Sequence, residues 1–212
     1  MFVSLFSGDA KDDRRKGRSM TGKTHSVTGI FAGLALSSYM GCSGTMTLAL
    51  AVGSVFGSLL PDIDNVHSKI GSAMPVAEFI VHGCQGVIRA LSFVFPRKMK
   101  ENIRSMVGHR GILHSAVIPA AMLLSLVFAG SAVGIEYFFL CGMIIGDISH
   151  MFLDLFSGGI PLLMPVSVRR IRLGSFQTGG IVDRLWRIVM YFGIGYLGLL
   201  DLYRMVSEYI RI

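Results

Sequence analysis

Long apolar stretches alternate with short polar ones along most of the chain, and this alternation predicts membrane-spanning helices. Residues 26–61 contain no charged side chain, and neither do residues 115–135. A helix needs about 20 predominantly apolar residues to cross the hydrocarbon core of a bilayer. The pattern divides into five hydrophobic segments, each expected to form a helix: residues 26–40, 45–60, 115–132, 137–156 and 188–200.

Two further segments differ from these five. Residues 76–95 are apolar but carry Glu78, His82 and Arg89, a pattern typical of an amphipathic helix lying on the membrane surface. Residues 1–19 form a polar, basic tail that lacks the apolar core of a signal peptide. We therefore predict an all-α fold, a multi-pass transmembrane bundle of about five spans plus an interfacial amphipathic helix. Residues 20–212 would form its single membrane-embedded domain.

Composition and charge agree with a membrane protein. Hydrophobic residues make up 52% of the chain and charged residues only 16%, whereas soluble domains carry about 25% charge. The 20 Lys and Arg residues exceed the 13 Asp and Glu residues, but they lie between the apolar runs rather than in a stripe with aromatics. We expect membrane lipids as partners and no nucleic acid. The three isolated cysteines predict neither a disulfide framework nor a cysteine-based zinc site.

The basic residues predict an orientation. They are concentrated in the first 23 residues and in residues 62–110 and 154–187, whereas the turns at 41–44 and 131–136 contain none. Cytoplasmic loops carry the excess of Lys and Arg, so these three segments should face the cytoplasm. Five spans would then place the C-terminus on the opposite side. Glycine pairs four apart, such as Gly53 and Gly57, predict close helix packing.

The remaining ionisable residues fall at helix ends. On the predicted topology, four groups far apart in sequence all lie at the cytoplasmic ends of their helices. Histidine and aspartate are ligands of zinc, manganese and iron, and His150 and Asp154 are four apart on one helix face. We therefore predict one site for a divalent metal ion at the cytoplasmic membrane face. Its candidate ligands are His25, Asp62, Asp64, His109, His114, His150 and Asp154.

A metal ion held at this site would supply a nucleophile for hydrolysis. A bound metal lowers the pKa of water towards about 7, and Asp64 or Asp154 would accept the proton. Arg110 would stabilise developing negative charge. The position of the site at the depth of the lipid head groups suggests a lipid-linked ester or phosphoester as substrate. Two alternatives stay open: an ion or proton transport protein, and a non-catalytic scaffold whose basic loop 62–110 docks a cytosolic partner.

Four ordered motifs carry a resemblance to a known family. They are Leu-Leu-Pro-Asp-Ile-Asp at 59–64, Gly-His-Arg-Gly-Ile-Leu-His-Ser at 108–115, Ser-His-Met-Phe-Leu-Asp at 149–154 and Gly-Ile-Pro-Leu-Leu-Met-Pro at 159–165. The chain resembles the YdjM-type family of inner-membrane metal-dependent hydrolases. That resemblance implies a metal-dependent hydrolase of the bacterial inner membrane, with its metal ligands at the matching His and Asp positions. It also leads us to expect a glutamate where this chain has Asp183.

Overall fold

The computed structural model of the chain describes residues 22–64, 75–107, 110–128, 134–174 and 180–210, and the architecture of these residues is helical. These described residues include one isolated antiparallel β-bridge, between Ile160 and Ile171, and no extended β-strand. The 3-10 turns among the described residues are η2 (Leu60–Asp64), η3 (Ser92–Val94) and η4 (Ile112–His114). The α-helices are α1 (Gly22–Met40), α2 (Thr45–Leu59), α4 (Pro75–Leu91), α5 (Arg97–Met106), α6 (Val117–Phe128), α7 (Ile135–Ser157) and α8 (Ile181–Ile210).

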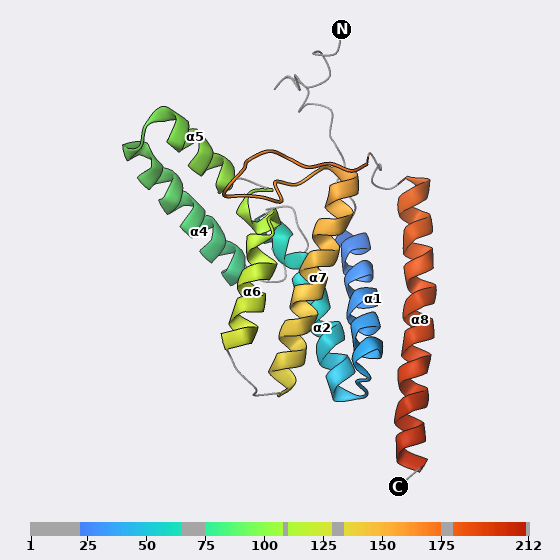
Figure 1. Cartoon of the computed structure of the whole chain (residues 1–212). Coiled ribbons are helices and arrows are strands. Elements are labelled where there is room, and N and C mark those ends of the chain that lie inside the picture. Colours follow the sequence, from blue (N-terminus) through green and yellow to red (C-terminus); the bar gives the residue numbers. More distant parts are fainter. Residues whose placement is uncertain (1–21, 65–74, 108–109, 129–133, 175–179, 211–212) are drawn as a thin grey trace.

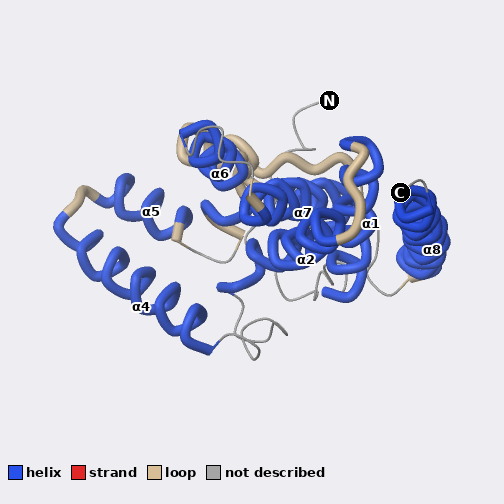
Figure 2. Tube along the Cα trace, turned by 90° about the horizontal axis from the view of Figure 1, so that it is seen from below, coloured by secondary structure: helices blue, strands red, loops and turns tan. Residues whose placement is uncertain are grey.

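The centre of the bundle consists of α1, α2 and α7, which lie side by side, with α6 beside α7 and α8 beside α1 (Figures 1 and 2). Cys42, Ala49, Leu50 and Phe138 form a small buried apolar cluster between these central helices. The predicted all-α helical bundle is confirmed. Its single-domain extent over residues 20–212 stays a prediction, and the tail 1–19 lies outside the described residues.

Glycines bring α2 and α7 into backbone contact. Gly53 and Gly57 on α2 face the backbone of α7, and Gly142 and Gly146 on α7 face the backbone of α2. A Cβ atom added at any of the four would overlap a main-chain carbonyl oxygen of the other helix. Small residues at a four-residue spacing allow this approach. The close packing that the sequence predicted is thus present, and it fixes how the ends of α2 and α7 align.

Three helical stretches among the described residues are long and apolar enough to cross a membrane, judged by length and composition. They are Thr45–Ile63, Ile135–Ser157 and Ile181–Ile210. Helix α6 is apolar but has only 12 residues, and α1 has 19 residues rich in Gly, Ser and Thr. The chain is therefore a helical membrane protein, and the count of five spans stays a prediction.

The last predicted segment, residues 188–200, was too short. Helix α8 runs without a break for 30 residues. Charged residues near both ends of α8 interrupt its apolar sequence, so a prediction based on uninterrupted apolar residues ends at them. Asp183 accepts a hydrogen bond from the Thr24 hydroxyl (2.6 Å) and Asp201 accepts one from the Thr47 hydroxyl (2.8 Å), so both carboxylates are held against the bundle.

Two segments frame the end of the bundle at which α1 begins and α7 ends. Helices α4 and α5 form a hairpin that projects sideways from this end (Figures 1 and 2). Residues 158–174, which we call the strap, cross over it from α7 towards α6 (Figure 1). Paired backbone hydrogen bonds between Ile160 and Ile171 close the strap, and the Ala116 amide donates to the Leu162 carbonyl (3.0 Å). The strap thereby ties the end of α7 to the start of α6.

Candidate metal centre

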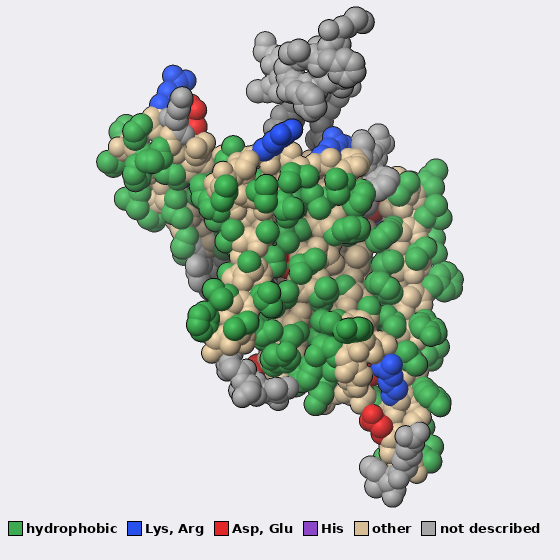
Figure 3. All heavy atoms as spheres, in the orientation of Figure 1, with side chains coloured by type: hydrophobic (Ala, Val, Ile, Leu, Met, Phe, Trp, Pro, Cys, Tyr) green, Lys and Arg blue, Asp and Glu red, His purple; other side chains and the backbone are tan. Residues whose placement is uncertain are grey.

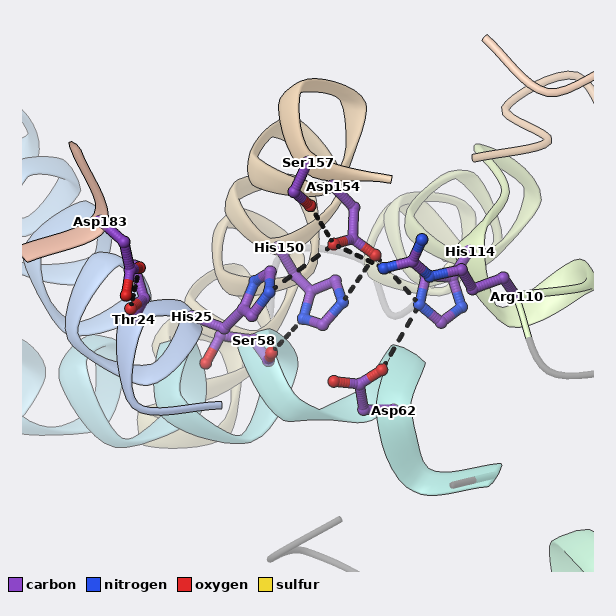
Figure 4. A network of polar contacts seen from close by, with 10 residues as sticks. All are labelled: Thr24, His25, Ser58, Asp62, Arg110, His114, His150, Asp154, Ser157 and Asp183. Carbon is purple, nitrogen blue, oxygen red and sulfur yellow. Dashed lines mark hydrogen bonds and ion pairs between the residues drawn. The ribbon is translucent and has the colours of Figure 1, made fainter. Parts of the chain in front are cut away.

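Ionisable side chains from four separate segments meet at the strap end of the bundle (Figure 4). His25 lies in the first turn of α1, and Asp62 lies in η2, directly after α2. His114 closes η4 just before α6. His150 and Asp154 lie four residues apart near the end of α7. Antiparallel packing of the helices brings these four segment ends together, as the sequence led us to expect.

Asp154 is the centre of the cluster. Its Oδ1 atom lies 3.3 Å from Nη2 of Arg110 and 3.7 Å from Nε2 of His25. Its Oδ2 atom lies 3.5 Å from Nε2 of His114 and 3.7 Å from Nε2 of His150. Asp62 approaches from the other side, with Oδ1 at 3.6 Å from the same His114 nitrogen. Two carboxylates and three imidazoles therefore surround one small volume.

The imidazole of His150 is held by its neighbours. Its ring stacks on the ring of His25 with centroids 3.9 Å apart, and its Nδ1 lies 2.6 Å from the carbonyl oxygen of Ser58. That carbonyl lies three residues before Pro61, which has no N–H group and so cannot donate the hydrogen bond of a 3-10 turn to it. When Nδ1 carries the proton for this bond, the Nε2 lone pair points into the cluster, which is the tautomer that a metal ligand needs.

The side chains at the centre of the cluster are shielded from solvent, and the cluster as a whole is open to solvent on one side. His25, His114, His150 and Asp154 are each at most 1% exposed. Asp62 and Arg110 keep 21% and 12% of their side chains exposed, so solvent reaches the cluster past these two. Burial lowers the pKa of the His114 imidazole, and Asp62 partly opposes that shift. The neutral imidazole, which is the form that binds metals, is thereby favoured at His114.

The arrangement fits a divalent cation. Both ring nitrogens of His25 and Nε2 of His150 are buried without a hydrogen-bond partner in the described structure. Two sets of possible ligands share His150: one with His25 and Asp154, the other with Asp62 and His114. A tetrahedral ion with bonds of about 2.1 Å holds its ligand atoms about 3.4 Å apart. The His–Asp separations of 3.5–3.7 Å match this spacing better than they match hydrogen bonds.

Some predicted residues are not placed in the cluster. His109 and the side chain of Asp64 lie outside the described residues, so their roles stay predictions. Asp147 lies on α7 seven residues before Asp154, fully buried, and joins neither set of possible ligands. Asp183, the position at which we expected a glutamate, lies away from the cluster, and its carboxylate accepts a hydrogen bond from Thr24 (Figure 4).

Besides the Ser58 carbonyl, sequence reasoning missed two residues that touch the cluster. The Ser157 hydroxyl donates to Oδ1 of Asp154 (3.0 Å), and its position three residues after Asp154 on the same helix face was an available signal. Gly158 lies against the guanidinium of Arg110, and an added Cβ would overlap its Nη1 atom. Arg110 itself has a positive φ of 57°, which is rare for a residue with a side chain. Neither feature of Arg110 could be read from the sequence.

The fold and the cluster define a helical membrane protein with a buried His/Asp site at one end of its bundle. The chain belongs to the YdjM inner membrane protein family, which it matches over residues 20–205. It is also similar to YvsG of Bacillus subtilis (strain 168), a protein described as uncharacterized. The two chains are 30% identical over 168 residues, which cover 78% of this chain and 86% of YvsG. No solved structure matches the chain.

Proposed function

We propose that the protein is a metal-dependent hydrolase of the inner membrane, with its site at the cytoplasmic face. The observation that carries this proposal is the convergence of three histidines and two aspartates from four segments on one buried volume. Burying so many ionisable groups is costly unless a cation or a proton balances the carboxylates. In membrane proteins, residues of this kind are usually functional.

The residues divide into binding and positioning roles. His25, Asp62, His114, His150 and Asp154 would hold one or two ions of zinc, manganese or iron, which share this ligand chemistry. Such an ion, when bound, lowers the pKa of water and polarises an ester or phosphoester oxygen. Ser157 and Arg110 orient the Asp154 carboxylate from two directions. The Ser58 carbonyl orients His150.

Arg110 and Asp62 face the open side of the cluster and are placed to meet a substrate. The Arg110 guanidinium can stabilise negative charge that develops on a carboxylate or phosphate group. Asp62, the more exposed carboxylate, can accept a proton from water. A site at the end of membrane-embedded helices is reached by a lipid whose head group stays at the surface. The proposed substrate is therefore a lipid-linked ester or phosphoester.

The test is hydrolysis by the purified protein in nanodiscs made of phospholipid. Release of fatty acid reports ester cleavage, and release of a water-soluble phosphate compound reports phosphoester cleavage. The proposal expects one of the two to depend on added divalent metal, to stop with a chelator and to be absent in His150→Ala. If the metal-loaded, correctly folded protein releases neither product, that result contradicts hydrolysis of such lipids.

A further inference from the structure

The hairpin Pro75–Met106, comprising α4, η3 and α5, has no part in the metal centre, and we call it the arm. It projects sideways from the end of the bundle that carries the His/Asp cluster (Figures 1 and 2). Among the described residues, α4 packs on η2, η3 and α5. The Arg89 guanidinium donates to the Val107 carbonyl (3.2 Å), which fastens α4 to the end of α5. The arm is thus an ordered unit attached to the bundle mainly through η2.

One surface of the arm is apolar and exposed. Phe79 and Leu91 on α4 are 78% and 62% exposed, and Phe93 and Val94 after it are 76% and 85% exposed. His82, Gln85 and Arg89, spaced three and four apart, form a polar stripe along α4. A helix with a broad apolar side and a narrow polar stripe is the type that lies in a membrane interface.

The other surface of the arm is cationic. Helix α5 has four basic residues and one acidic residue, Glu101, in its sequence. The Lys100 ammonium lies 4.3 Å above the centre of the Phe93 ring, so positive charge directly adjoins the apolar tip. In Figure 3, hydrophobic side chains cover the flank of the arm and Lys and Arg side chains lie at its upper edge. Basic side chains above the bundle lie at the same end of the molecule.

We propose that the arm binds the layer of anionic phospholipid head groups at the membrane surface next to the His/Asp cluster. The apolar side of α4 would lie at the boundary between head groups and acyl chains, and the cations of α5 would contact lipid phosphates. An anionic lipid surface offers apolar and negative groups in adjacent layers, which matches the adjacent apolar and cationic surfaces of the arm. This inference concerns the arm alone and does not depend on the metal centre.

Cys84 provides a native reporter for the test. It is exposed on α4, and by helix register it lies on the apolar side, four and seven residues before Ile88 and Leu91. The full-length protein is labelled there with an environment-sensitive thiol dye, and Cys84→Ala supplies the background. Nanodiscs are made of phosphatidylcholine alone or with about one-third phosphatidylglycerol. Quenching by lipid-borne nitroxide is compared with quenching by iodide in the water.

The proposal expects about threefold stronger nitroxide quenching in the anionic discs, together with protection from iodide. Removing three charges from α5, with Arg97→Gln, Lys100→Gln and Arg104→Gln, should abolish the difference between the two lipids. The matched control removes three charges from the strap, with Arg169→Gln, Arg170→Gln and Arg172→Gln, and should preserve it.

Three results would overturn the inference. Strong iodide quenching with weak nitroxide quenching in both discs would place the arm in water, where a soluble protein partner would fit better. Equal nitroxide quenching in both discs would show that the arm enters lipid without selecting anionic head groups. A label at Gln85→Cys, in the Cys84→Ala background, should be more accessible to iodide than Cys84, and equal accessibility would contradict the proposed orientation of α4.

Discussion

Asp154 organises the candidate centre at the scale of single residues. It is 1% exposed and faces Arg110, Ser157 and three imidazoles at once. The identity of the main participants could be predicted, because histidines and aspartates at helix ends are rare in so apolar a chain. The Ser58 carbonyl and the left-handed backbone of Arg110 could not, since both depend on how the chain folds locally.

The position of Arg110 leads to a prediction about Gly158. A methyl group there would overlap the Arg110 guanidinium, which can move because it ends a flexible side chain. We expect Gly158→Ala to shift Arg110 away from Asp154 and to lower the proposed hydrolysis by about 100-fold, as loss of one charge-stabilising group does. Bound metal, measured by mass spectrometry, should stay unchanged. If Gly158→Ala retains full hydrolysis while Arg110→Ala does not, Gly158 does not position Arg110.

Asp147 provides a second prediction at this scale. Both of its oxygens are buried without a hydrogen-bond partner in the described structure, and an uncompensated buried carboxylate destabilises a fold. Asp147→Asn should therefore raise the unfolding temperature by a few degrees and leave bound metal unchanged. Asp154→Asn, on the same helix, is the matched variant and should lose metal. Metal loss from Asp147→Asn would make Asp147 a ligand, contrary to its placement.

At the scale of elements, the accuracy of the sequence prediction depended on where charges fall. The segment predicted at 137–156 closely matches α7, because its aspartates and histidine lie on one buried face and leave the apolar run readable. Helix α8 was underestimated, because Asp183, Arg187, Asp201 and Arg204 interrupt the run near its ends. The hydrogen bonds of Asp183 and Asp201 to α1 and α2 residues appear only in the folded protein.

The contact between α2 and α7 leads to a prediction about their glycines. A Cβ at Gly57 would overlap the Met143 carbonyl oxygen, so Gly57→Ala should force these helices apart. Overpacking of this kind costs about 1–3 kcal/mol, measurable as a lower unfolding temperature in detergent. Gly198→Ala on α8 is the control, since an added Cβ there meets nothing within 4 Å and alanine favours a helix. Equal stability of the two variants would contradict the close packing.

At the scale of the whole molecule, the two ends of the bundle differ in chemistry. One end gathers the His/Asp cluster. At the opposite end, Ser37, Thr47 and Asp201 form a chain of hydrogen bonds. The Arg204 guanidinium donates hydrogen bonds to Ser38 at this same end. Asp201 and Arg204 belong to α8, whose length the apolar runs of the sequence underestimated. These polar groups have their hydrogen-bond partners within the protein. Between the two ends of the bundle, glycines bring the backbones of α2 and α7 into contact. This arrangement favours a site at one surface over a transport path.

The central claim is that the His/Asp cluster holds a divalent metal ion, and metal analysis of the purified protein tests it most directly. The protein is isolated in detergent, exposed to zinc, manganese or iron in turn, and freed of excess ion. We predict about one or two tightly bound ions per chain for at least one of these metals. His150→Ala should lose most of that metal, and the remote variant His82→Ala on α4 should keep it. Equal metal content in the wild type and in a folded His150→Ala, or no metal bound to either, would contradict the account.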